Sequence, residues 1–379
     1  MPRGPSRREV VAAAATPLAS IFGSGFLIIV PVLESTLGGL SVFGAAAVCA
    51  LAWSAGNAVR HCVTVVEPSA ARGDLDTGTR RLDRTSDAVI VVAYVISVAL
   101  YLRILSEYVF RFFGSGSTTG ERVLACALVV LIVAVGIMRG FHGLDLLDRV
   151  ALIAVLVVVT VVIIVLGVHD VRDLTAGSLS LPPRADVGVG TTLLTLGGVV
   201  ITVQGFETVR YLGDQYGIQT RVQASRLAQL VATVVYIALV AAATPAMGPG
   251  GTPGVDTTLL DITGRVAPLL SIPIVLTAVL SQLSAAIADT VSAEGNLNDL
   301  LGWMRGARPY LVSGAAAVLL AATMPTFTIV AVASRAFAAY YAIQAVVAMR
   351  TTTGAARQAG YGALAAAMTA ITLFALPAG

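Results

Sequence analysis

Two short segments place glycine and polar residues inside long apolar stretches of the sequence. They are residues 20–27 (SIFGSGFL), followed by Pro31, and residues 202–210 (TVQGFETVR), preceded by Gly197 and Gly198. Each glycine costs a helix about 1 kcal/mol relative to alanine, so such groups of glycines favour a kink or a break. A broken membrane helix frees N–H groups, which can bind a carboxylate, and C=O groups, which can bind an ammonium group or a cation. We therefore expect one polar binding site here; the alternative is that the glycines only allow close helix packing.

A carboxyl group also falls inside an apolar stretch, at Asp289. An ionised side chain in the bilayer is costly, so each one is a candidate for a functional role. Asp289 could bind Na⁺ directly, or it could take up and release a proton. The alternative is a local role near the end of its helix, because Glu294 and Asn296 follow closely.

Three further charged residues lie within predicted membrane segments. Arg103 and Glu107 are four residues apart and can pair on one helix face, either as a structural ion pair or as a gate. Arg335 lies deeper in its segment and needs an acidic partner, which the sequence does not identify. The three cysteines have no paired spacing and no neighbouring histidines, so we expect no metal site and no cofactor except a coupling Na⁺.

The composition predicts the class of protein that positions these residues. The 379 residues are 57% hydrophobic and only 12% charged, whereas soluble domains are about 25% charged. Only helices or closed barrels satisfy their main-chain hydrogen bonds in lipid, and the long unbroken apolar runs exclude alternating barrel strands. All 24 basic residues are arginines, scattered over loops, so a nucleic-acid interface is not expected. The chain is therefore predicted to be an all-α polytopic protein in contact with the lipid bilayer.

Hydropathy predicts about eleven transmembrane helices, each near the ~20 residues that cross a bilayer. The expected segments are 16–33, 39–58, 88–110, 122–138, 149–168, 190–212, 227–246, 266–292, 309–323, 326–348 and 359–377. With a cytoplasmic N-terminus, 17 arginines fall on the cytoplasmic side, five on the other side and two within segments, which accounts for all 24. This bias follows the positive-inside rule. We expect a multi-pass plasma-membrane protein with an extracellular C-terminus.

The two interrupted segments also resemble a known family. The sequence from Gly23 to Leu27, with Pro31, is similar to the first-helix signature of amino acid–polyamine–organocation (APC) transporters, and residues 204–207 are similar to their sixth-helix element. The resemblance implies a LeuT-like fold of two inverted five-helix repeats plus one extra helix, with helices 1 and 6 broken. The implied divisions are a cytoplasmic tail (1–15), a first repeat (16–168), an extracellular loop (169–189), a second repeat (190–348), and an eleventh helix with its tail (349–379).

The same resemblance implies roles for individual residues. Main-chain N–H groups at the first break would bind a substrate carboxylate, carbonyl groups at the second would take an amine, and Phe206 would stand beside them as a wall or gate. The implied substrate-binding set is Ser24, Gly25, Phe26, Val203, Gln204, Gly205, Phe206 and Glu207. Sodium-coupled relatives have an Ala-x-x-Ser/Thr-Ser/Thr pattern in the eighth helix, where this chain has Ala286, Asp289 and Thr290. The lysine that proton-coupled members often use is absent, because the chain has no lysine.

These observations together predict secondary active transport of a small solute by alternating access, coupled to H⁺ or Na⁺. An amino acid or an organic amine is the implied substrate. The alternatives are a transporter of potassium or another inorganic ion with the same fold, and a membrane sensor that does not transport. No nucleotide-binding loop, filter-like repeat or nucleophile–histidine pair is apparent, so neither an ATP-driven pump, a channel nor an enzyme is expected. The sequence predicts no particular oligomeric state.

Overall fold

The computed structural model describes residues 5–23, 25–139, 145–184, 188–248 and 258–377. Throughout these ranges the secondary structure is helical, without strands, as the composition predicts. The α-helices are α1 (Arg7–Ile21), α2 (Gly25–Leu37), α3 (Ser41–His61), α4 (Glu67–Arg72), α5 (Thr77–Phe112), α6 (Thr118–Arg139), α7 (Asp145–Ala176), α8 (Val189–Gly197), α9 (Ile218–Ala243), α10 (Leu259–Val266), α11 (Ser271–Leu300), α12 (Ala307–Thr323), α13 (Thr326–Thr351) and α14 (Ala355–Phe374).

Short helices of other types join several of these elements. A π-helical stretch, η2 (Cys62–Val66), links α3 to α4. The 3-10 helices are η1 (Gly38–Leu40), η3 (Val200–Val203), η4 (Phe206–Leu212), η5 (Pro245–Met247) and η6 (Pro268–Leu270). Gly38 in η1 has a φ of +53°, which glycine adopts without strain, and this turn connects α2 to α3.

Seven helical stretches in the described ranges are long and apolar enough to cross a membrane. They are residues 25–72, 77–112, 118–138, 148–176, 218–247, 268–300 and 326–351, and Ala307–Thr323 is a shorter apolar helix. The protein is thus a polytopic membrane protein, while the expected count of eleven helices and the inverted repeat remain predictions.

Some helices extend beyond the predicted segments. α5 begins at Thr77, where the sequence suggested a connecting loop, because the Asp76 side chain caps the helix by accepting a hydrogen bond from the Thr79 N–H at 3.0 Å. α7 continues to Ala176, into the stretch expected as an extracellular loop. Similarly, α1 begins at Arg7, within the expected tail.

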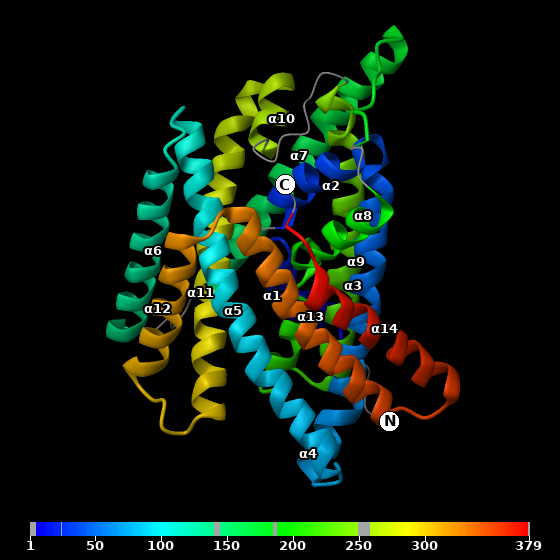
Figure 1. The fold of residues 1–379 in the computed structure, drawn as a ribbon, viewed down its shortest axis with the longest axis vertical. Helices are drawn as coiled ribbons and strands as arrows, with labels where there is room; N and C mark the ends of the chain where they lie inside the picture. The colour runs from blue at the N-terminus through cyan, green and yellow to red at the C-terminus, as the bar shows by residue number, and fades with distance from the viewer. Residues whose placement is uncertain (1–4, 24, 140–144, 185–187, 249–257, 378–379) are drawn as a thin grey trace.

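The long helix α5 organises the packing. It crosses the molecule obliquely in Figure 1 and packs against α11 and α13, while α6 and α12 pair beside it. Tyr94 and Tyr101 of α5 are fully buried, so their hydroxyl groups lie inside the protein. The structure also interrupts the helix at both predicted places, between α1 and α2 and between α8 and η4.

Candidate functional site

The first interruption is short, and neighbouring side chains satisfy its carbonyl groups. α1 ends at Ile21, whose carbonyl accepts a hydrogen bond from the Tyr236 hydroxyl of α9 at 2.6 Å. The Gly23 carbonyl accepts a hydrogen bond from the side-chain amide of Gln282 in α11. Ser24, one of the predicted binding residues, lies outside the described residues. The carbonyl end of α1 is therefore fixed by two other helices.

The second interruption is longer. The α-helical pattern stops at Gly197, and two 3-10 helices follow before α9. The Gly198 carbonyl accepts a hydrogen bond from the Ser334 hydroxyl of α13 at 2.7 Å. Gly205 has a φ of +123°, a conformation that side-chain-bearing residues rarely adopt. This glycine thus permits the main-chain conformation at which η4 begins.

The two interruptions touch one another. A Cβ atom on Gly25 would overlap both the Thr202 carbonyl and the Tyr236 hydroxyl. A Cβ atom on Gly205 would lie 2.6 Å from the Ile21 nitrogen and 2.7 Å from the Ser20 hydroxyl. The absence of a side chain at both glycines therefore lets the two broken segments approach at main-chain distance, which the sequence pattern alone could not establish.

Glu207 has a fully buried carboxyl group at the second break. Its Oε2 atom accepts two hydrogen bonds of 2.8 Å, from the Gly205 N–H and from the Tyr341 hydroxyl of α13. Its Oε1 atom has no hydrogen-bond partner among the described residues. The ring of Tyr341 stacks on Phe206 with centroids 5.2 Å apart, so the predicted aromatic wall packs against the residue that orients the carboxyl group.

Gln204 supplies a second free oxygen. Its side-chain amide donates to the Tyr101 hydroxyl at 3.1 Å, while its Oε1 atom has no partner in the described ranges. Val203 is buried beside it, and Phe26 is buried in α2. The described members of the predicted substrate set thus lie at or directly beside the two breaks, and their role in binding remains a prediction.

Asp289 is buried in α11: the residue is 4% exposed, and its Oδ2 atom has no hydrogen-bond partner among the described residues. It lies within electrostatic range of Glu207. α11 continues to Leu300, so Asp289 does not lie at the end of its helix. The interior placement argues against the purely local role that Glu294 and Asn296 suggested.

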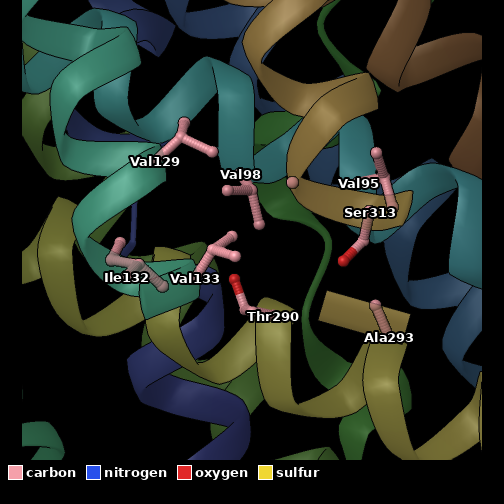
Figure 2. Close-up of a pocket in the computed structure, with 9 residues that line it drawn as sticks. Val95, Val98, Val129, Ile132, Val133, Thr290, Ala293 and Ser313 are labelled. Atoms are coloured by element: carbon pink, nitrogen blue, oxygen red, sulfur yellow. The ribbon is translucent and has the colours of Figure 1, made fainter. Parts of the chain in front are cut away.

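The other two residues of the predicted ion site, Ala286 and Thr290, are placed less favourably for binding an ion. The Thr290 hydroxyl donates to the Ala286 carbonyl of its own helix at 2.7 Å. Figure 2 shows Thr290 pointing toward Val98 and Val133, in a small, mainly apolar space between α5, α6, α11 and α12. An ion-ligand role for Thr290 and Ala286 remains a prediction, and the orientation of Thr290 does not favour it.

The predicted ion-pair residues find various partners. Glu107 lies 3.6 Å from Arg111, which also pairs with Asp261 of α10 at 2.9 Å. Arg103 donates a hydrogen bond to the Thr326 hydroxyl at 3.4 Å, and its pairing with Glu107 remains a prediction.

Arg335 donates a hydrogen bond to the Ala375 carbonyl, directly after α14, at 3.0 Å. It forms no ion pair with a described acidic residue. A main-chain carbonyl thus takes the place of the expected carboxylate.

A network of ion pairs lies beyond the second break. Arg210 lies 3.2 Å from Asp83 and 3.6 Å from Glu67, and Arg221 lies 2.7 Å from Glu67. These contacts join η4 to α4, α5 and α9. The sequence analysis did not single out this set, because its members lie far apart in the chain.

Sequence reasoning also missed the residues that orient the site. Four polar side chains contact the breaks from other helices: Tyr101, Tyr236, Gln282 and Tyr341. The signal in the sequence was a polar residue within an apolar segment.

Glu34 in α2 was missed as well, although it is 1% exposed and both of its carboxyl oxygens lack a described hydrogen-bond partner. The nearby Thr244 hydroxyl donates to the Val240 carbonyl instead.

Comparisons with known proteins identify the family of the chain. The chain matches a family described as "APC superfamily transporter" over residues 5–375. It is also 31% identical over 347 residues to an uncharacterized protein of Aquifex aeolicus (strain VF5), covering 90% of this chain and 84% of that protein. The chain therefore belongs to the APC superfamily of transporters.

Proposed function

We propose that the protein is a secondary active transporter that moves a small, positively charged or amine-bearing solute by alternating access. The solute would bind between the two broken helices, where the segment between α8 and α9 contributes Gln204 and Glu207 and α11 contributes Asp289. An amino acid or an organic amine is the proposed substrate class, and H⁺ or Na⁺ is the proposed coupling ion.

The observation that carries this proposal is an excess of free acceptor oxygens beside the breaks. Gln204 Oε1, Glu207 Oε1 and Asp289 Oδ2 are all buried without a hydrogen-bond partner among the described residues. Neither carboxyl group forms an ion pair within the described ranges. Buried acceptors left unpaired are costly, so a ligand that brings N–H groups or positive charge would be stabilised there.

The burial of the region is consistent with an occluded state of such a carrier. Phe206 and Glu207 are at most 1% exposed, and the Arg210 network lies on one side of them. On the other side, Arg111 and Asp261 join α5 to α10. We infer that these two ionic contacts open alternately, because a binding site between them would otherwise be inaccessible to solutes.

Uptake into proteoliposomes tests this proposal. Purified protein would first be screened by thermal shift against amino acids, amines and alkali cations, because a bound ligand raises the melting temperature by mass action. Glu207→Gln should then weaken binding of the positive hit by about tenfold or more, since hydrogen bonds to a charged group contribute about 1.5–3 kcal/mol. Unchanged affinity and uptake would refute the role of this carboxyl group.

Asp214→Asn is the matched control, because Asp214 is an exposed carboxyl group just beyond η4. It should leave binding and uptake as in the parent protein. Asp289→Asn tests the coupling role separately. Its uptake should lose the dependence on a pH or sodium gradient, whereas an intact gradient dependence would rule Asp289 out as the coupling residue.

An inorganic cation is a second candidate substrate, because the free atoms at the breaks are oxygens, the ligands that alkali and alkaline-earth cations prefer. The same screen separates the two proposals. A thermal shift with K⁺ alone, at constant ionic strength, together with cation-dependent flux and no amine response, would favour the ion carrier.

A further inference from the structure

A second polar cavity lies away from the breaks, between α3, α9 and α14. Its volume is about 560 Å³, and it is lined by Arg60 and His61 of α3, Arg226 of α9 and Arg357 of α14. None of the described residues that line it is acidic. Among the described residues, these three arginines form no ion pair with a carboxylate. The cavity therefore concentrates positive charge without an anion of the protein to neutralise it.

Arg60 forms the buried part of this cavity and is 4% exposed. Its guanidinium group lies 5.0 Å above the Trp53 ring and donates hydrogen bonds to Ser225 at 3.2 Å, to Asn57 at 2.8 Å and to Gln229. All of these partners are neutral, so they orient the guanidinium group and leave its charge uncompensated.

Other positive groups face Arg60 across the cavity. Arg226 lies within electrostatic range of Arg60, and Arg357 lies within range of His61. Like charges held together repel one another, and an anion bound between them would attract each of them and offset this repulsion.

An apolar groove continues from this cavity along the same two helices. Its volume is about 370 Å³, and the described residues that line it are all apolar; they belong to α3, α8 and α14, with Ala375 directly after α14. On α3, Leu51 of the groove is three residues from Ser54 of the cavity; on α14, Ala367 of the groove is three residues from Leu364 of the cavity. Because one helical turn rises about 5.4 Å, the two spaces adjoin along one seam.

We propose that this seam binds an anionic phospholipid, with its phosphate among Arg60, Arg226 and Arg357 and an acyl chain in the apolar groove. The cavity lies where α3 ends and α14 begins, toward the α4 end of the molecule (Figure 1). The arginine distribution predicts this end to be cytoplasmic, and basic pockets between helices on that side bind anionic headgroups. The proposal does not depend on the identity of the transported solute.

Native mass spectrometry of the full-length, delipidated protein in detergent tests the proposal. Phosphatidylglycerol should bind more tightly than phosphatidylcholine of the same chain length, because a zwitterionic headgroup carries no net charge. Arg226→Gln/Arg357→Gln should weaken phosphatidylglycerol binding by roughly 25-fold, since each arginine near an anionic headgroup contributes about fivefold. The control Arg81→Gln/Arg84→Gln removes two exposed arginines of α5 that do not line the seam, and it should have no measurable effect.

The acyl-chain half of the proposal has its own variant. Ala370 is an exposed residue that lines the groove, and Ala370→Phe should fill it and weaken phosphatidylglycerol binding while Arg60 stays in place. Inorganic phosphate is the last ligand to be tested, and its binding is measured as an increase in the melting temperature of the protein. Stabilisation by phosphate equal to that by phosphatidylglycerol, with no effect of Ala370→Phe, would identify a soluble-anion pocket and overturn the lipid assignment. Equal binding of the two lipids, or equal losses in the arginine pair and its control, would also overturn it.

Discussion

The first and second helix breaks differ in what satisfies their polar groups. At the first break, Tyr236 and Gln282 come from other helices and donate to the carbonyls of Ile21 and Gly23. At the second break, Ser334 and Tyr341 of α13 also donate hydrogen bonds, but the carboxyl group of Glu207 retains a free oxygen after accepting two of them. The main-chain carbonyls of the first break are thus held by neighbouring helices, whereas the second break has a carboxyl group of its own with unused capacity for hydrogen bonding.

This difference suggests a division of roles between breaks that look alike in sequence. A carbonyl that already accepts a hydrogen bond from a protein side chain is largely satisfied, so that contact contributes mainly to stability. A buried oxygen without a partner has most to gain from a ligand. We therefore expect substitutions at the first break to affect melting temperature and those at the second to affect transport. The following predictions run from the largest expected effect to the smallest.

Gly205→Ala should have the largest effect, because both breaks depend on this glycine. Alanine at a φ of +123° is strained, and its Cβ atom would lie 2.6 Å from the Ile21 nitrogen. We expect a loss of about 3 kcal/mol or more in stability together with loss of uptake. Thermal melting in detergent measures the loss of stability. Gly295→Ala is the control, because Gly295 is helical with open space around it, and its melting temperature should not fall.

Gln282→Leu should destabilise the first break, because the Gly23 carbonyl would lose its donor and stay buried. Leaving such a group unsatisfied costs about 1–3 kcal/mol. The melting temperature should fall well below that of Gln223→Leu, which changes an exposed glutamine of α9. Equal melting temperatures of the two variants would show that the first break does not depend on its neighbours.

Tyr236→Phe and Tyr341→Phe make the same chemical change at the two breaks. The first removes the hydrogen bond to the Ile21 carbonyl and should lower the melting temperature, by an amount corresponding to about 1–2 kcal/mol, with unchanged substrate affinity. The second removes one donor from the Glu207 carboxyl group but keeps the ring that stacks on Phe206. It should change the affinity for substrate more than stability. If both variants shift the same property, the proposed division of roles is wrong.

Thr208→Val should have the smallest effect. The Thr208 hydroxyl donates to the Gly205 carbonyl at 2.7 Å, but the Thr208 N–H also donates to that carbonyl, at 3.2 Å. Because the carbonyl keeps one donor, the loss should be about 1 kcal/mol or less. A loss as large as that of Gln282→Leu, measured by the same thermal melt, would mean that the second break also relies on its carbonyl contacts for stability.

The sequence by itself determined the membrane class, the helical secondary structure and the places where two helices are interrupted. These properties follow from local composition, because a low charge content requires lipid contact, and glycine weakens a helix wherever it occurs in the chain. Gln204, Glu207 and Asp289 were identifiable for a similar reason, since each is a polar residue within an apolar stretch.

Only the tertiary structure decided which groups satisfy the breaks. The donors Tyr236 and Gln282 lie more than 200 residues from the carbonyls they contact, and no local pattern links them. The orientation of Thr290 toward the small space between α5, α6, α11 and α12 and the partner of Arg335 were likewise decided by packing. A side chain one residue further along a helix points about 100° away, so an apolar segment read from sequence does not reveal which of its polar residues face a common site.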